Sequence, residues 1–336
     1  MSVVDTLLSP LRSIAAAETS PTSVCSVWSV GVAIVIAFAW IAWRRRRRGR
    51  RVRMALLFRA VFSRRVLLHR STRADLAYAF LTLTLLGTLI GSAVISTAWV
   101  AGGAAAALAA VFGEARPRPA SLSGDAARTL AVFLAYDLGF FVDHTLKHRF
   151  PALWELHKTH HSAEALTPLV NFRVHPLDSL ILANTLALFI GVGGGIAAYA
   201  FGRNATSFSL FDVNVLMLAY IYLTAQLQHS QIWIPFTGFA GRLFMSPAHH
   251  QLHHSADPAH FNCNMGASLA VWDWIFGSLR LPSSRSPRLT YGVSGFDHDP
   301  HGVAGLLIEP AVKFALSVIP LRLVAAAGSA RGRRLA

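Results

Sequence analysis

The stretch VWSVGVAIVIAFAWIAWRRRRRGR, residues 27–50, joins an uncharged apolar run to a block of arginines. A helix of ~17–25 apolar residues is long enough to cross the hydrocarbon core of a bilayer. Arginines that directly follow such a run mark its cytoplasmic end. The stretch therefore predicts a retained signal-anchor helix whose C-terminal end lies in the cytoplasm.

Composition indicates the same class of protein. Of the 336 residues, 54% are hydrophobic and 14% are charged, whereas a soluble domain carries about 25% charged residues. Further apolar runs predict an all-α, polytopic membrane protein with about four to five transmembrane helices and a histidine-rich cytosolic cap. The predicted spans are residues 27–43, 76–98, 126–143, 179–201 and 209–228, with a short re-entrant or interfacial piece at 99–112.

The formal net charge of +15 is concentrated in the arginine block 44–53 and in the tail 331–334. Juxtamembrane arginines indicate topology and attract anionic lipid head groups. Aromatic residues do not alternate with the arginines of this block, so nucleic acid is not an expected partner. We divide the chain into an N-terminal anchor with a basic interfacial segment (1–75), a membrane domain (76–285) and a C-terminal basic interfacial tail (286–336).

Histidines are unevenly distributed along the chain. Twelve of the fifteen lie between His144 and His260, and the predicted topology places all twelve at or below the cytoplasmic membrane surface. DLGFFVDHTLKH (137–148) has two histidines four residues apart, on one face of a helix. LWELHKTHHS (153–162) and HHQLHH (249–254) both contain the spacing HxxHH. Three such boxes on one side of a membrane predict a metal site.

Neutral imidazole is a ligand for iron, zinc, copper and nickel. A tetrahedral zinc site needs four ligands, or three and a water, so eight box histidines favour two metal ions with open positions. Two irons fit the use of O2 on an unactivated C–H bond, because zinc has no redox chemistry. His229 ends the last span on the same side and joins the boxes. The nine expected ligands are His144, His148, His157, His160, His161, His229, His250, His253 and His254.

The remaining histidines are weaker candidates. On helix geometry His249 lies opposite the face shared by His250 and His254, so we expect it not to be a ligand. Bound histidines usually donate their second N–H to a carboxylate or carbonyl group. Candidates for a metal-binding or supporting role, with ordinary structural roles equally open, are His175, His260, Asp137, Asp178 and Asp273. The isolated histidines expected to be structural are His69, His298 and His301.

Together these motifs resemble a known group. D-x3-F-x2-H-x3-H, LWELHKTHHS, FRVHPLD, SPAHHQLHHSADPAHFNCNMG and WDWIFGSL, from about residue 137 to residue 281, are similar to the fatty acid hydroxylase / sterol desaturase superfamily of membrane di-iron proteins. The chain departs from the family pattern at Thr145, where arginine is common, at Ser278, where threonine is common, and at Met265, where an aromatic residue is usual. No box histidine is replaced, but Met265 is expected to reshape the substrate entrance.

The resemblance implies O2-dependent hydroxylation or desaturation of a lipid, sterol-like or fatty-acyl, at two iron ions held by the boxes. Electrons from NAD(P)H are expected to arrive through a separate protein, cytochrome b5-like, ferredoxin or flavoprotein. The chain itself has no HPGG haem element, Gly-rich flavin fingerprint or cysteine cluster. Which lipid is oxidised, and whether it is hydroxylated or desaturated, stays open.

Two other functions would need features that differ from those of this sequence. A membrane metal-binding or transport protein would place its ligands near mid-membrane, but the boxes lie outside the predicted spans. A zinc-dependent membrane hydrolase would need a general base such as the Glu of HExxH, and the sequence has no such element. The Ala- and Arg-rich composition is typical of a GC-rich bacterium, so the expected location is the bacterial inner membrane, with the site on its cytoplasmic side.

Overall fold

The computed structural model describes residues 19–24, 26–83, 95–115, 119–202 and 206–318. It is helical apart from one two-stranded hairpin, which confirms the predicted fold class. The first half contains α2 (Val27–Arg46), α3 (Met54–Val61), α4 (Arg64–Leu67), α5 (Arg70–Leu81), α7 (Thr97–Phe112), α8 (Leu122–Arg149), α9 (Pro151–His161) and the 3₁₀ helix η2 (Pro168–Phe172).

The second half begins with the long helix α10 (Pro176–Phe201) and the hairpin of β1 (Ser209–Leu210) and β2 (Val213–Asn214), which is antiparallel. A continuous helical stretch follows, made of α11 (Val215–Tyr220), the π-helical η3 (Ile221–Ala225) and α12 (Gln226–Gln228). The remaining elements are α13 (Gly238–Leu243), α14 (Pro247–His253), η4 (Pro258–His260), α15 (Val271–Phe276), η5 (Ala304–Ile308) and α16 (Glu309–Val318).

Three described helices, α2, α8 and α10, are long and apolar enough to cross a membrane. They correspond to three of the predicted spans. The predicted span 76–98 includes residues 84–94, which lie outside the described residues. The predicted span 209–228 begins with the β-hairpin, and only residues 215–228 are helical. At 1.5 Å per residue that helix is about 21 Å long, shorter than the ~30 Å hydrocarbon core.

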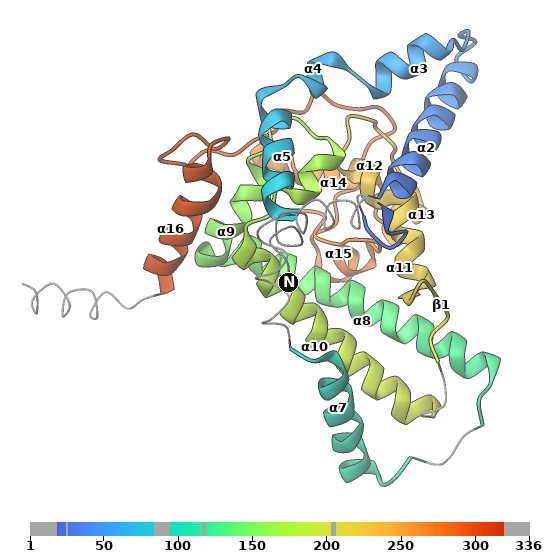
Figure 1. The fold of residues 1–336 in the computed structure, drawn as a ribbon. Helices are drawn as coiled ribbons and strands as arrows, with labels where there is room; N and C mark the ends of the chain where they lie inside the picture. The colour runs from blue at the N-terminus through green and yellow to red at the C-terminus, as the bar shows by residue number, and fades with distance from the viewer. Residues whose placement is uncertain (1–18, 25, 84–94, 116–118, 203–205, 319–336) are drawn as a thin grey trace, which may run out of the picture.

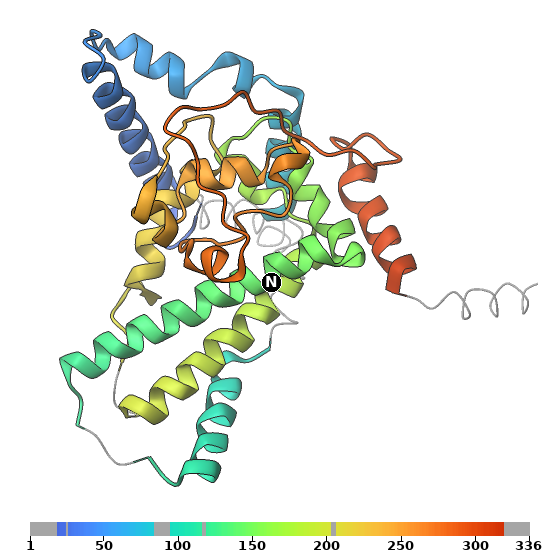
Figure 2. The same cartoon turned by 180° about the vertical axis from the view of Figure 1, so that it is seen from behind.

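α7, α8 and α10 pack side by side and extend from one side of the molecule (Figures 1 and 2). A small residue allows α7 to approach α10 closely. A Cβ on Gly195 would lie 2.5 Å from the carbonyl oxygen of Ala101 and 2.7 Å from the Cβ of Ala104. The predicted interfacial piece at 99–112 is therefore a helix that packs on α10.

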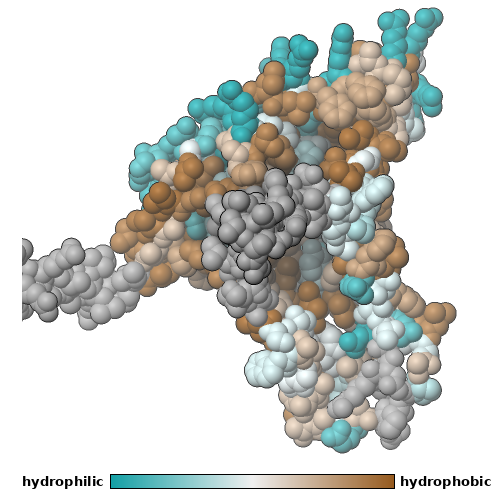
Figure 3. All heavy atoms as spheres, in the orientation of Figure 1, coloured by the Kyte–Doolittle hydropathy of each residue, from teal (hydrophilic) through white to brown (hydrophobic). Residues whose placement is uncertain are grey.

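α2 extends from the opposite side of the histidine-bearing segments (Figures 1 and 2). It packs on η3, α12 and α3, and its Trp40 Nε1 donates a hydrogen bond of 2.9 Å to the carbonyl oxygen of Trp233. The segment after it, predicted as a basic interfacial helix, is divided into α3, α4 and α5. Its arginines and apolar side chains are both exposed, and Figure 3 shows hydrophilic residues along this rim above hydrophobic ones.

Candidate metal centre

The ends of four helices bring the histidine boxes together. Pro151 is the first residue of α9, and Phe150 before it is extended, as a residue before proline prefers. This break turns the chain sharply, so the last two turns of α8 contact α9. α14 begins at a capping box in which Ser246 and His249 bond reciprocally. α12 ends at the residue before His229.

The nine histidines predicted as ligands form two groups. Within each group, one ligand atom from every residue lies within 4.8 Å of the others. The first group is His144, His148, His157, His161 and His253, and the second is His160, His229, His250 and His254. All are buried except His148, which is half-buried.

Each HxxHH box contributes to both groups. On a helix, residues four apart differ by about 40° in direction, whereas a residue three along lies about 60° to the other side. His157 and His161 accordingly face the first group, and His160 between them faces the second. In the other box His250 and His254 face the second group, and His253 faces the first. The repeated spacing thus connects two adjacent centres.

The ring nitrogens of each group converge on one another. The Nε2 atom of His229 lies 3.0–3.1 Å from the Nε2 atoms of His160, His250 and His254. His253 Nε2 lies 3.1 Å from His161 Nε2. The Nε2 atoms of three first-group residues are buried without a hydrogen-bond partner, and these residues are His144, His148 and His157. Unpaired buried nitrogens are costly, and a cation between them would satisfy them.

Three first-group rings are oriented by acceptors behind them. His144 Nδ1 and His253 Nδ1 each lie 2.8 Å from a backbone carbonyl, that of Met265 and that of Cys263 respectively. His157 Nδ1 lies 3.0 Å from the carboxylate of Asp178. A ring that donates from Nδ1 presents the lone pair of Nε2 to the group, which is the usual arrangement of metal-bound histidine.

Burial also keeps the imidazoles neutral. Burial, with a smaller contribution from neighbouring histidines, lowers the pKa of His253 and of His229 to about 3, although the hydrogen bond to the Cys263 carbonyl opposes this for His253. Burial, followed by charge repulsion among the rings, lowers the pKa of His160, His161 and His254 well below the usual value. At pH 7 these side chains therefore have free lone pairs for a metal ion. An all-imidazole donor set suits iron, zinc, copper and nickel.

Asp178 is tied into a buried ionic network. Lys147 forms ion pairs with Asp178 and, at 2.6 Å, with Asp143. Thr185 donates a hydrogen bond of 3.2 Å to Asp143. Lys147 and both carboxylates are almost fully buried. The network fixes the carboxylate that His157 contacts.

The other two candidate acids accept hydrogen bonds from the segment 265–272. Asp137 accepts hydrogen bonds from the N–H of Ser268 and from the indole of Trp272, both at 2.9 Å. Asp273 accepts from the N–H of Met265 at 2.7 Å. Among their described hydrogen bonds none involves a histidine. They fix the segment whose Met265 carbonyl contacts His144, so their effect on the His144 ring is indirect.

His175, His260 and His249 lie outside both groups. His175 is the N-cap of α10, where its Nδ1 accepts from the N–H of Leu177 at 3.2 Å. His260 Nδ1 lies 3.0 Å from Ser255 Oγ. His249 is the buried partner of Ser246 in the capping box. The structure thus separates these residues from the nine that converge.

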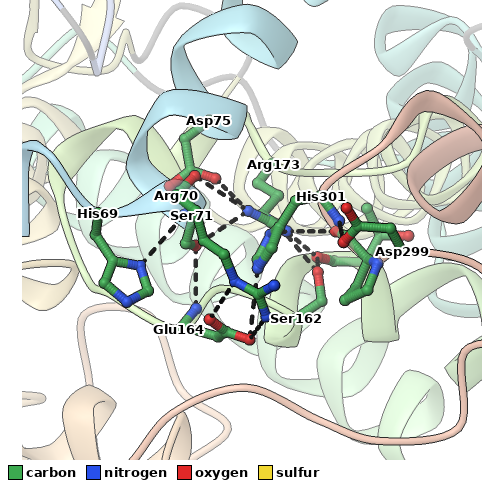
Figure 4. Close-up of polar contacts among 11 residues, drawn as sticks. His69, Arg70, Ser71, Asp75, Ser162, Glu164, Arg173, Asp299 and His301 are labelled. Carbon is green, nitrogen blue, oxygen red and sulfur yellow. Dashed lines mark hydrogen bonds and ion pairs between the residues drawn. The ribbon is translucent and has the colours of Figure 1, made fainter.

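Arg173 is an important residue that the sequence did not single out. It is fully buried and pairs with Asp75 at 2.6 Å. Its Nε donates to the carbonyl of Thr159 at 3.2 Å and to Ser162 Oγ at 3.0 Å, at the C-terminal end of α9. Its Nη2 reaches Pro300 and His301. Figure 4 shows this one guanidinium joining α5, α9 and the 299–301 loop.

Two cavities adjoin the histidines. One, of about 210 Å³, is lined by residues of both groups, by the Lys147 network and by apolar side chains such as Phe140 and Leu182. The phenols of Tyr136 and Tyr220 also line it. The other, of about 340 Å³, reaches three histidines of the first group, beside Trp154 and Phe261.

A fatty acid hydroxylase family model matches residues 129–278, which contain all nine histidines. The match confirms that this segment resembles the fatty acid hydroxylase family, as its motifs predicted. Human alkylglycerol monooxygenase is 26% identical over 167 residues, which is 49% of this chain and 32% of that protein. Human cholesterol 25-hydroxylase is 30% identical over 170 residues, 46% of this chain and 52% of that protein.

Alkylglycerol monooxygenase of Danio rerio is also 26% identical, over 166 residues. The chain thus spans about a third to a half of the length of these curated relatives. No solved structure matches the chain significantly. The two histidine groups lie within the fatty acid hydroxylase segment, whereas Asp75 and His301, which contact Arg173, lie on either side of it.

Proposed function

We propose that the chain is a membrane-bound oxidoreductase that uses O2 to hydroxylate or desaturate a lipid at a pair of iron ions. The observation that carries this proposal is the pair of buried all-histidine groups that line one cavity with apolar walls. The family match and the names of the relatives, an alkylglycerol monooxygenase and a cholesterol hydroxylase, support a lipid as the substrate class.

Each part of the chain has a role in this proposal. The nine histidines hold the metal ions, and two redox-active ions so held would supply the activation of O2. Asp178 keeps the His157 ring oriented, and the backbone carbonyls of Met265 and Cys263 do the same for His144 and His253. The cavity of about 210 Å³ positions the lipid beside both groups and limits the access of water.

The partners follow from the same proposal. Electrons come from NAD(P)H through a separate cytochrome b5-like, ferredoxin or flavoprotein donor. The basic N-terminal segment contacts anionic lipid head groups, because exposed arginines and apolar side chains alternate along it. The protein lies in the bacterial inner membrane, and its histidine groups face the cytoplasm.

The test is reconstitution of the purified chain with ferrous iron, a reductase system with NADPH, and a lipid extract. We expect isotopically labelled O2 to enter a lipid alcohol, or an O2-dependent double bond to form. His229→Ala should abolish product. The matched control His298→Ala should retain product, because His298 is exposed and lies outside both groups.

Two outcomes would favour the other candidates. Turnover that needs one zinc ion and no O2 would indicate a hydrolase. Transport of metal ions across vesicle membranes, without oxidised lipid under any donor system, would indicate a transporter.

A further inference from the structure

Four arginines surround a hollow at the C-terminal end of α2. Its volume is about 370 Å³. Its walls include Arg44, Arg45, Arg48 and Arg50, the indole of Trp40, and loop residues 231–233. No acidic side chain lines it.

The charges of these arginines are not compensated by the protein. In the described part of the chain, none of the four forms an ion pair with an acidic side chain. Arg45 Nε donates to the carbonyl of Arg51 at 3.0 Å, and the Arg44 guanidinium lies 5.9 Å from the ring centre of Trp40. Neither contact neutralises a charge. Like charges gathered in one hollow repel one another, and a bound anion would remove this repulsion.

A phosphate group has the chemistry that this hollow can recognise. Guanidinium groups bind phosphate through paired, charge-assisted hydrogen bonds. Tryptophan at the edge of an apolar helix is typical of the membrane interface. Large apolar side chains are exposed next to the hollow: Trp43 is 48% exposed, Met54 58% and Phe58 49%. Such side chains would contact acyl chains, which a free phosphate does not have.

We propose that this hollow binds the phosphate head group of an anionic phospholipid, whose acyl chains cover the exposed apolar side chains of α2 and α3. This inference rests on the contact with anionic head groups proposed above for the basic N-terminal segment, and it does not depend on the proposed oxidation site. We expect the bound lipid to carry one phosphate group and a net negative charge, as phosphatidylglycerol does.

The loop at 231–233 connects the hollow to the second histidine group. The wall at 231–233 begins two residues after His229 in the chain. Gln251 Nε2, on α14, donates to the carbonyl of Ile232 at 3.0 Å, and Trp40 Nε1 donates to that of Trp233. A head group held by the arginines would therefore restrain the loop that positions His229.

The experiment measures retention of single lipids on the purified full chain in neutral detergent by native mass spectrometry. Phosphatidylglycerol, phosphatidylcholine and inorganic phosphate are added separately. The site variant is Arg45→Gln/Arg48→Gln. The control variant is Arg64→Gln/Arg65→Gln, which removes the same charge from exposed residues of α4 that do not line the hollow.

We expect one phosphatidylglycerol to be retained by the wild type and by the control, with phosphatidylcholine and inorganic phosphate much weaker. The site variant should bind phosphatidylglycerol about 30-fold more weakly, since each arginine near an anionic head group contributes about fivefold. Arg45→Lys/Arg48→Lys should recover part of the affinity, and it separates loss of charge from misfolding.

Equal losses in the site and control variants would overturn the proposal, because binding would then depend on overall charge. Equal retention of phosphatidylcholine would also overturn it. Inorganic phosphate binding as tightly as phosphatidylglycerol would assign the hollow to a soluble phosphate compound instead. If the double glutamine variant does not fold, the single variant Arg50→Gln, at an exposed position, replaces it. This variant should bind phosphatidylglycerol at least threefold more weakly than the wild type.

Discussion

Replacing Arg173 by methionine should destabilise the protein more than any exposed arginine substitution. Methionine has a similar length but cannot replace the guanidinium, so Asp75 would be left fully buried without its charged partner. The carbonyls of Thr159 and Pro300 would also lose a charged donor. The three segments that Arg173 joins would then be held together by packing alone.

The magnitude follows from burial. Breaking a buried ion pair by removing one partner costs about 3–5 kcal/mol, because the remaining charge is uncompensated. For a domain of this size, about 4 kcal/mol lowers the thermal midpoint by about 8–16 °C. The shift should be larger still if the two carbonyls remain unpaired, since each such group adds about 1–3 kcal/mol.

Thermal unfolding of purified variants in one neutral detergent measures the effect. Arg64→Met is the control, because Arg64 is exposed and its side chain contacts no described acid. The double variant Arg173→Met/Asp75→Leu should be more stable than Arg173→Met alone, since it removes the unpaired charge. A shift below about 2 °C for Arg173→Met, or a double variant less stable than the single one, would refute the reasoning.

Three further predictions concern single contacts. Asp178→Asn should weaken metal binding about 10–100-fold, measured by chelator competition, because the acceptor behind His157 loses its charge. Burial raises the pKa of Glu309, but the hydrogen bonds it accepts outweigh this and lower the pKa to about 2. The wild type should therefore have a higher thermal midpoint than Glu309→Gln above pH 4.5, and this difference should disappear as the pH falls towards 2. Gly195→Leu should lower the thermal midpoint by several degrees through its clash with α7, whereas Gly102→Ala, with open space around it, should not.

Spacing and polarity along the chain predicted much of the fold and of the candidate site. The apolar runs identified α2, α8 and α10 because a membrane helix needs a long, predominantly apolar segment, which is a local property. The HxxHH spacing brought His157, His160 and His161 into the predicted site. It did not assign them to separate groups, because that depends on which facing helix lies on each side of α9.

The contacts missed by the sequence connect distant segments. Arg173 contacts Asp75, 98 residues away, and Pro300, 127 residues away, and no local pattern in FRVHPLD reveals either partner. The role of His175 had a readable signal. It precedes Pro176, the first residue of an apolar run with Asp178 in its first turn, and this arrangement is typical of a helix N-cap.

The central claim is that nine histidines hold two redox-active metal ions. Metal analysis of the purified chain, loaded anaerobically with ferrous iron, tests it directly when the wild type is compared with His144→Ala and His229→Ala, one variant for each group. We predict two irons per chain in the wild type and loss of iron in each variant. One metal ion per chain, or full iron content in both variants, would contradict it.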